Sequence, residues 1–298
     1  MTEFRATPAS HTSHVLAEGP VWNPATSSVL WVDVEEGSVF EGRIADGTVE
    51  LTRQLDFDGR VGAAVPADDG SLLVAAHDRL VVVSSDGDRF DGPALIATGV
   101  LSRANDGACD PAGRFVVGTL ALDEREGEEF LYRLEDDGSL VALDSDLTLS
   151  NGIAWSPGGT VLYSTDTIPG IIWARDYDVE TGAVGARRQH LHIQDGFPDG
   201  ICVDARGYLW VAIWGAGEVR SFSPAGIPSD TVRVAAPHVS SVAFVGDGLD
   251  RLLITTAARD LSAAERLVYP DAGRLFLADV QTTGTPTTPW AASALVHL

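Results

Sequence analysis

The chain has 298 residues and a formal net charge of −23, and its 20 basic residues are all arginines because the sequence contains no lysine. The absence of lysine excludes a lysine Schiff base and P-loop phosphate binding, since both need that side chain. A protein this acidic is a poor partner for nucleic acid or for an anionic membrane surface, and no apolar run approaches the length of a membrane span. The N-terminal segment lacks the charged and apolar regions of a secretory signal, so we expect a cytoplasmic location.

A strand–turn–strand pattern recurs along the chain, with alternating apolar residues on both sides of a polar turn. Its copies lie at residues 18–33, 62–74, 105–118, 150–166, 198–212 and 241–255. A glycine marks the same position in the first five copies, at 19, 62, 107, 152 and 200, and Ser241 marks it in the sixth. The period is roughly 40–48 residues, which is typical of the blade of a β-propeller.

The repeats predict an all-β fold, a six-bladed β-propeller that forms a single domain over residues 1–298. The blades are expected at about 15–56, 57–100, 101–147, 148–194, 195–236 and 237–281. One blade cannot bury both of its faces, and packing around a ring supplies the missing burial. Residues 3–7 are the candidate strand that closes the ring by pairing into the blade formed by the other terminus. Residues 282–289, rich in Thr and Pro, are expected to wrap over the surface.

The two cysteines, Cys109 and Cys202, each follow a phase-marking glycine by two positions. Equivalent positions in non-adjacent blades are too far apart for a disulfide, which needs Cα atoms within about 7 Å. No Cys-x-x-Cys spacing indicates a zinc site. The sequence also lacks a Gly-x-Ser-x-Gly elbow and a His-Glu-x-x-His motif, so serine-hydrolase and zinc-protease chemistry have no support.

The residue just before each of these repeated glycine or serine positions is the candidate for metal binding or catalysis. In chain order it is Glu18, Val61, Asp106, Asn151, Asp199 and Ser240. The first strand of every propeller blade lines the central channel, so equivalent side chains of different blades face one another across it. Three carboxylates and an amide at one level would repel strongly, and a divalent cation relieves that repulsion with the oxygen ligands it prefers. The alternative is that Asn-Gly and Asp-Gly are turn dipeptides, which accounts for Asn151 and Asp199 separately but not for Glu18.

Several of these segments resemble the regucalcin, gluconolactonase and luciferin-regenerating enzyme family. They are residues 17–22 (AEGPVW), 105–107 (NDG), 110–114 (DPAGR), 150–152 (SNG) and 198–200 (PDG), in the family's order over nearly the whole chain. The resemblance implies a six-bladed propeller that hydrolyses sugar lactones with one divalent metal. It implies metal ligands at Glu18, Asn151 and Asp199. It further implies substrate contacts at Arg103 and Asn105, and at Asp123 where some relatives have Glu.

The expected reaction is hydrolysis of an aldonolactone to the aldonic acid. A bound cation, Ca, Mg, Zn, Mn or Fe, would polarise the carbonyl and activate water as a Lewis acid. Asp199 is the candidate for proton transfer. The alternative is water activated at the cation and steered by Asp199 or Asp106, and we group Asp106 with the substrate-binding residues. A carboxylate on a cation has a lowered pKa and is a weak base, which leaves both routes open.

Two other functions compete with sugar lactone hydrolysis. The first is a non-enzymatic propeller that binds a divalent metal or senses a ligand, because this fold hosts many functions. Arg103 beside Asn105 argues against it, since a pure cation site has no use for a guanidinium. The second is a lactonase or esterase that acts on non-sugar lactones, which a pocket with several aromatic residues would favour.

Overall fold

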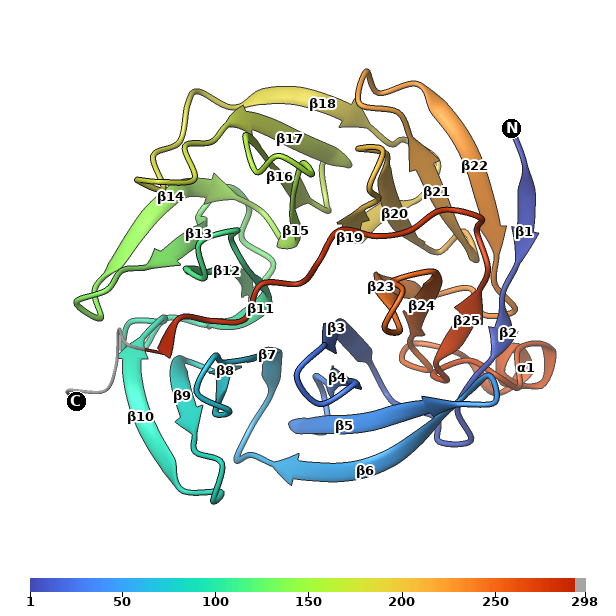
Figure 1. Ribbon diagram of the computed structural model, residues 1–298, viewed down its shortest axis with the longest axis horizontal. Coiled ribbons are helices and arrows are strands. Elements are labelled where there is room, and N and C mark those ends of the chain that lie inside the picture. The colour runs from blue at the N-terminus through green and yellow to red at the C-terminus, as the bar shows by residue number, and fades with distance from the viewer. Residues whose placement is uncertain (293–298) are drawn as a thin grey trace.

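The computed structural model describes residues 1–292 of the chain and contains six small sheets arranged in a ring around a central channel (Figure 1). This arrangement confirms the predicted six-bladed β-propeller. The predicted single domain extends to residue 298, and residues 293–298 lie outside the described part of the chain.

From the channel outward, each blade begins with strands that follow one another in the chain, and the first of them is innermost. The first three blades consist of β3 (Ala17–Asn23), β4 (Ser28–Asp33), β5 (Ser38–Ala45) and β6 (Thr48–Asp56); β7 (Val61–Pro66), β8 (Leu72–Ala76), β9 (Arg79–Val83) and β10 (Arg89–Ala94); and β11 (Ser102–Cys109), β12 (Phe115–Ala121), β13 (Glu129–Leu134) and β14 (Leu140–Leu147). The last three contain β15 (Ser150–Trp155), β16 (Val161–Asp166), β17 (Ile171–Asp176) and β18 (Arg188–His192); β19 (Phe197–Val203), β20 (Leu209–Trp214), β21 (Glu218–Phe222) and β22 (Pro228–Arg233); and β23 (Val239–Val245), β24 (Arg251–Thr256) and β25 (Phe276–Ala278).

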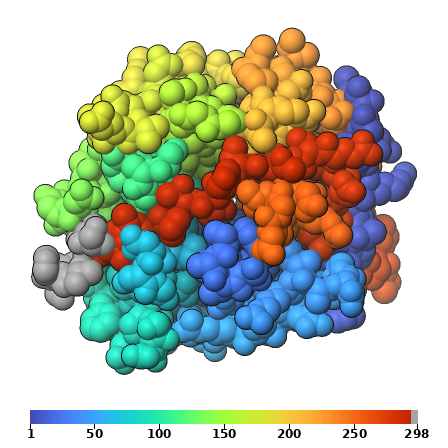
Figure 2. All heavy atoms as spheres, viewed as in Figure 1, coloured from blue at the N-terminus to red at the C-terminus, as the bar shows by residue number. Residues whose placement is uncertain are grey.

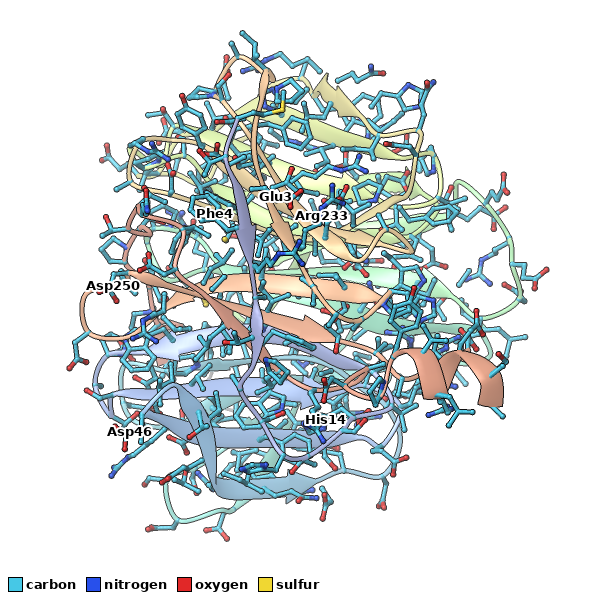
Figure 3. All side chains as sticks on the ribbon, turned by 90° about the vertical axis from the view of Figure 1, so that its right-hand side faces the viewer. Glu3, Phe4, His14, Asp46, Arg233 and Asp250 are labelled. Atoms are coloured by element: carbon cyan, nitrogen blue, oxygen red, sulfur yellow. The ribbon has the colours of Figure 1, made fainter. Side chains whose placement is uncertain are left out.

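Both termini take part in closing the ring. Strand β2 (Thr7–Pro8) pairs antiparallel with β25 and completes the sixth blade as its outermost strand. Strand β1 (Glu3–Arg5) pairs parallel with β22 and adds a fifth strand to the fifth blade. The expected closing strand over residues 3–7 is therefore divided between two blades. Figure 3 shows Glu3 beside Arg233, where the Arg233 Nε donates to the Glu3 Oε2 at 3.0 Å.

Packing explains why glycine recurs at the equivalent position in several blades. A Cβ on Gly62 would lie 2.1 Å from the backbone oxygen of Asn105 in the next blade, and one on Gly152 would lie 2.4 Å from that of Asp199. At these two positions the neighbouring inner strand is too close for a side chain, whereas a Cβ on Gly19 would meet no atom of residues 1–292 within 4 Å and the sixth copy carries Ser241. The pairing register of every inner strand shifts here as well. Such bulges re-aim the adjacent side chains, here toward the channel.

A C-terminal strap, defined here as residues 279–292, crosses one mouth of the channel (Figures 1 and 2). The strap leaves the sixth blade and contacts the fifth, where the backbone N–H of Ala205 donates a hydrogen bond to Thr283 O at 2.8 Å. It then reaches the junction of the second and third blades. There Trp290 donates its backbone N–H to Pro66 O at 2.8 Å and is only 1% exposed. The expected surface wrapping of residues 282–289 is observed, and it joins opposite sides of the ring.

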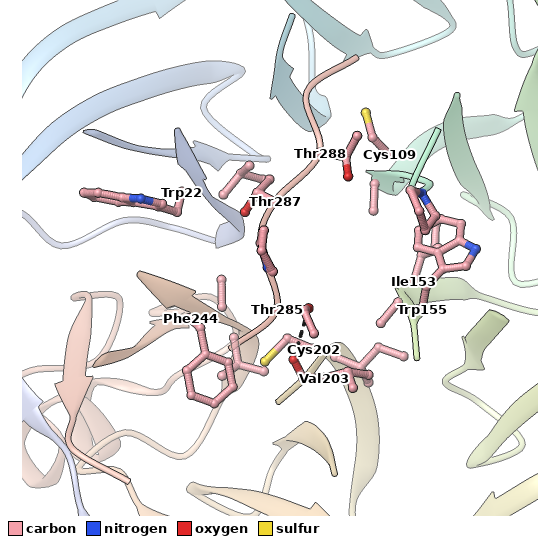
Figure 4. Close-up of a pocket in the computed structure, with 18 of the residues that line it drawn as sticks. Trp22, Cys109, Ile153, Trp155, Cys202, Val203, Phe244, Thr285, Thr287 and Thr288 are labelled. Atoms are coloured by element: carbon pink, nitrogen blue, oxygen red, sulfur yellow. Dashed lines mark hydrogen bonds between the residues drawn. The ribbon is translucent and has the colours of Figure 1, made fainter. Parts of the chain in front are cut away.

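Beneath the strap lies a cavity of about 240 Å³ (Figure 4). Its walls include Trp22, Trp155 and Phe244 together with both cysteines, Cys109 and Cys202. The cysteines are free thiols, as the spacing predicted. Burial raises the pKa of both thiols well above the ordinary value, so they remain protonated at neutral pH.

The one helix of residues 1–292, α1 (Ala263–Val268), lies between β24 and β25 and begins with a capping box between Ser262 and Glu265. In Figure 3 it projects from the side of the molecule away from Asp46 and Asp250. Within the described part of the chain no helix has the length and apolar character needed to cross a membrane.

Candidate metal and substrate site

A second cavity, of about 460 Å³, opens at the start of the inner strands. Its lining includes Glu18 on β3, Arg103 and Asn105 on β11, Asn151 on β15 and Asp199 on β19. Residues further along the same strands line the cavity beneath the strap. The strap therefore covers the far end of the channel, and we name the open cavity the channel pocket. The fold thus brings five sequence-predicted residues from four blades into one pocket.

The floor of the channel pocket concentrates buried negative charge. Glu18 is 9% exposed and Asp199 is 5% exposed. Burial raises the pKa of both carboxyls well above their usual range, and the charge of Asp199 raises that of Glu18 further. Asn151 donates from Nδ2 to Oδ1 of Asp199 and to the Thr167 hydroxyl at 3.2 Å. Within residues 1–292 neither carboxylate forms an ion pair.

Asp106 lies near this floor but outside the lining of the channel pocket. One of its carboxylate oxygens accepts the Gly107 N–H at 2.7 Å. Burial raises its pKa to about 6, and its negative charge in turn raises the pKa of Glu18 and of Asp199. Asp106 thus adds negative charge next to the two floor carboxyls without lining the pocket, and its substrate contact stays a prediction.

Arg103 and Asn105, both on β11, are held in place by hydrogen bonds to each other and to the backbone. The Nη1 of Arg103 donates to Asn105 Oδ1 at 2.7 Å and to the backbone oxygen of Ala104 at 2.8 Å. Asn105 in turn donates from Nδ2 to Ser150 O of the next blade at 2.9 Å. Arg103 is only 3% exposed, and burial lowers its pKa to about 10. A buried guanidinium held from one side keeps donors free for a ligand.

Asp123, expected to contact substrate, is not among the residues that line the channel pocket. Its carboxylate instead accepts a hydrogen bond at 2.8 Å from Arg125, which also pairs with Glu129 at 2.6 Å. This ion-pair network holds the Asp123 side chain within its own loop. The neighbouring Leu122 and Glu124 do line the pocket, and the substrate contact of Asp123 stays a prediction.

Four residues that line the channel pocket were not identified from the sequence, and we call these four the wall of the pocket. Glu35 lies just after β4, Thr167 just after β16 and Arg259 just after β24, while Arg60 directly precedes β7. Three of these four residues occupy the turn after the second strand of their blade. That shared position is the signal that could have identified them. Trp214, at the end of β20, also lines the pocket and stacks on His238 with 4.3 Å between ring centroids.

The chemistry of the floor fits a divalent cation. Two buried carboxylates that form no ion pair with any of residues 1–292, together with the amide of Asn151, offer oxygen donors of the kind that hard cations prefer. Within residues 1–292 no group of three or more His, Cys, Asp or Glu side chains is arranged to hold a metal. The candidate set at Glu18, Asn151 and Asp199 therefore depends on its amide.

Fold and site together define a class of protein, the six-bladed propeller with a carboxylate and amide centre in its channel. The model of the SMP-30/gluconolactonase/LRE-like region matches residues 16–258, and the chain belongs to this family. Pentonolactonase XacC of Haloferax volcanii is 33% identical over 281 residues, covering 92% of this chain and 94% of the relative. Regucalcin of Danio rerio is 33% identical over 269 residues, 88% of this chain and 89% of the relative.

A solved structure shares the complete architecture. The calcium-binding protein regucalcin from Agrobacterium tumefaciens superimposes with a TM-score of 0.90 at 25% identity, covering 97% of this chain and 99% of that chain. The family resemblance inferred from the motifs is confirmed.

Proposed function

We propose that this protein is a sugar lactonase that hydrolyses an aldonolactone to the aldonic acid with the help of one divalent cation. The observation that carries the proposal is the channel pocket itself. A buried guanidinium, that of Arg103, and two buried carboxylates, those of Glu18 and Asp199, line one cavity of about 460 Å³. The names of the relatives, pentonolactonase among them, support lactone chemistry.

The floor residues Glu18, Asn151 and Asp199 would hold the cation, which when bound supplies Lewis-acid polarisation of the lactone carbonyl. Arg103 and Asn105 orient the ring by hydrogen bonds to its oxygens and hydroxyls. Asp199 accepts the proton that the attacking water loses as its oxygen bonds to the carbonyl carbon. The bond between the carbonyl carbon and the ring oxygen then breaks, and the ring oxygen takes that proton from Asp199 to become the hydroxyl of the acid.

A second candidate is hydrolysis of lactones that carry an apolar substituent. One side of the pocket mouth bears Leu122, Ile168 and Phe197, whose exposed fractions are 41%, 48% and 48%. Exposed apolar side chains around a cavity favour contact with apolar ligand surface. The floor, in contrast, is polar, and a hydroxyl-free ligand would leave its buried groups unpaired.

A panel of lactones assayed by titration of the released acid tests the proposal and separates these candidates. We expect hydroxylated lactones such as D-xylonolactone and D-gluconolactone to react far faster than γ-butyrolactone or its alkyl-substituted analogues. Faster turnover of the alkyl lactones would favour the second candidate. If the protein binds Ca²⁺ but opens no lactone, it is a non-enzymatic metal-binding propeller, as the relatives named regucalcin allow.

A further inference from the structure

One carboxylate at the wall of the channel pocket holds two guanidiniums from two other blades. Glu35 follows β4 of the first blade, Arg60 precedes β7 of the second, and Arg259 follows β24 of the sixth. The Nε of Arg60 donates to Glu35 Oε2 at 2.8 Å, and the Nη1 of Arg259 donates to Glu35 Oε1 at 2.9 Å. All three residues line the pocket. Both oxygens of Glu35 are thus engaged, and each arginine has a defined position.

A third guanidinium lies within electrostatic reach of this group. The charges of Arg60 and Arg259 act on Arg103 to lower its pKa, although burial has the largest effect, and Glu35 acts in the opposite direction. Arg259 also contacts Asp260 at 3.1 Å, but that carboxylate is 68% exposed and is therefore largely screened by solvent. Arg60 and Arg259 bring two positive charges to the one negative charge of Glu35, so this group of three is net positive, although Glu124 and Asp260 also line the pocket.

This local positive charge occurs in a protein whose formal net charge is −23. An anionic ligand approaching so acidic a surface is repelled unless its site supplies compensating charge. The guanidiniums also have donors to spare. Glu35 engages Arg60 through Nε alone, and no hydrogen bond from the Nη1 or Nη2 of Arg60 is found among residues 1–292. A guanidinium fork of this kind matches the geometry of a carboxylate or phosphate.

We propose that Arg60 and Arg259, positioned by Glu35, bind an anionic group at the end of the lactone remote from its reacting carbonyl. The preferred substrates are then acidic sugar lactones, which carry a carboxylate or phosphate in addition to the lactone ring. This inference rests on the proposed lactonase function and specifies its substrate class. Neutral sugar lactones can bind to the floor residues of the pocket, but they offer no anionic group to Arg60 and Arg259.

The test compares two lactones that differ at one carbon. D-gluconolactone ends in a neutral hydroxymethyl group, whereas D-glucarolactone, closed through the same carbonyl, ends in a carboxylate. We expect the wild-type kcat/KM for D-glucarolactone to exceed that for D-gluconolactone by about tenfold or more, the size of one or two charge-assisted hydrogen bonds. D-gluconolactone phosphorylated on the same carbon distinguishes phosphate from carboxylate recognition.

Variants at the wall provide the second arm. Arg60→Gln and Arg259→Gln should each lower the ratio of the two kcat/KM values by about tenfold. Arg251→Gln removes an exposed arginine outside the channel pocket and should leave that ratio unchanged. Thermal unfolding of each variant verifies that it is folded. An equal loss on both lactones would contradict the proposal, because it would mean that the arginines support the pocket or bind the carboxylate that every product carries.

The affinity for the reaction products, measured by calorimetry, tests anion recognition independently of catalysis. D-glucarate carries two carboxylates and D-gluconate one, so wild type should bind D-glucarate more tightly, and Arg60→Gln should remove the difference. Equal affinities, or a wild-type preference for D-gluconolactone in the assay, would overturn the inference while leaving the lactonase function intact. If neither lactone is opened, the proposed function fails, and product binding alone decides whether the wall recognises anions.

Discussion

The amide of Asn151 donates a hydrogen bond to the carboxylate of Asp199, although the two residues lie 48 positions apart on the inner strands of neighbouring blades. Directly beside this contact, Gly152 packs against the backbone oxygen of Asp199. The polar contact and the close backbone approach thus occur at one level of the channel. Structural packing and the candidate cation site depend on the same few positions.

The first prediction concerns this close approach. A Cβ at Gly152 would lie 2.4 Å from Asp199 O, whereas one at Gly158 would have no atom of residues 1–292 within 4 Å. Gly152→Ala should therefore destabilise the protein by about 1–3 kcal/mol through overpacking, and it should displace Asp199. Gly158→Ala, in the turn between β15 and β16, is the matched control. Equal free energies of unfolding for the two variants would refute this account of the repeated glycine.

The second prediction concerns the strap. Trp290 is 1% exposed and packs in the core cluster of the second and third blades. Trp290→Ala should cost about 3–5 kcal/mol of unfolding free energy, as for other large buried aromatic side chains. Freed at this end, the strap should also admit reagents to Cys109 and Cys202 beneath it, so both thiols should react faster with a maleimide. Unchanged labelling in a folded variant would show that the strap does not control access to the cavity.

Much of this fold was predictable because each blade repeats one pattern and the repeat itself fixes which strand faces the channel. The same phase identified Glu18, Asn151 and Asp199, which the structure brings into one pocket. The phase of the inner strands could not reveal Arg60 and Arg259, since they lie in connections between strands. There the residue type differs from blade to blade, even though Arg259 follows a second strand as Glu35 and Thr167 do. Their convergence follows from the ring, which places the first, second and sixth blades side by side.

The third prediction concerns Arg103. Its Nη1 is fixed by Ala104 O and Asn105, so its other donors are presented to the ligand. Arg103→Ala should lower kcat/KM for a hydroxylated lactone by about 10²-fold, the usual effect of losing one positioned donor. The cation content, measured by elemental analysis, should not change. A variant that opens D-gluconolactone as fast as wild type would remove Arg103 from the proposed mechanism.

The fourth prediction concerns pH and Asp33, which is buried at the end of β4. Burial alone would raise its pKa, but hydrogen bonds from His14 and from the backbone of Val15 and Leu16 outweigh that effect and lower it. The ionised carboxylate therefore stabilises the fold. Its contribution is complete above the unfolded pKa of about 3.9 and is lost as the pH falls through the lower folded pKa. Asp33→Asn should be destabilised at neutral pH, and its difference from wild type should shrink below about pH 4. Asp58→Asn, at an exposed position, is the control for the substitution itself.

The most direct test of the central claim is the rate of lactone hydrolysis before and after removal of divalent cations. Protein treated with a chelator, and shown by elemental analysis to be free of metal, should lose activity on D-gluconolactone by about 10²-fold or more. One equivalent of the correct divalent cation should restore it in wild type, and restore far less in Asn151→Ala, which lacks one proposed ligand. Full activity in the metal-free wild-type protein would contradict the assignment of Glu18, Asn151 and Asp199 as a catalytic metal centre.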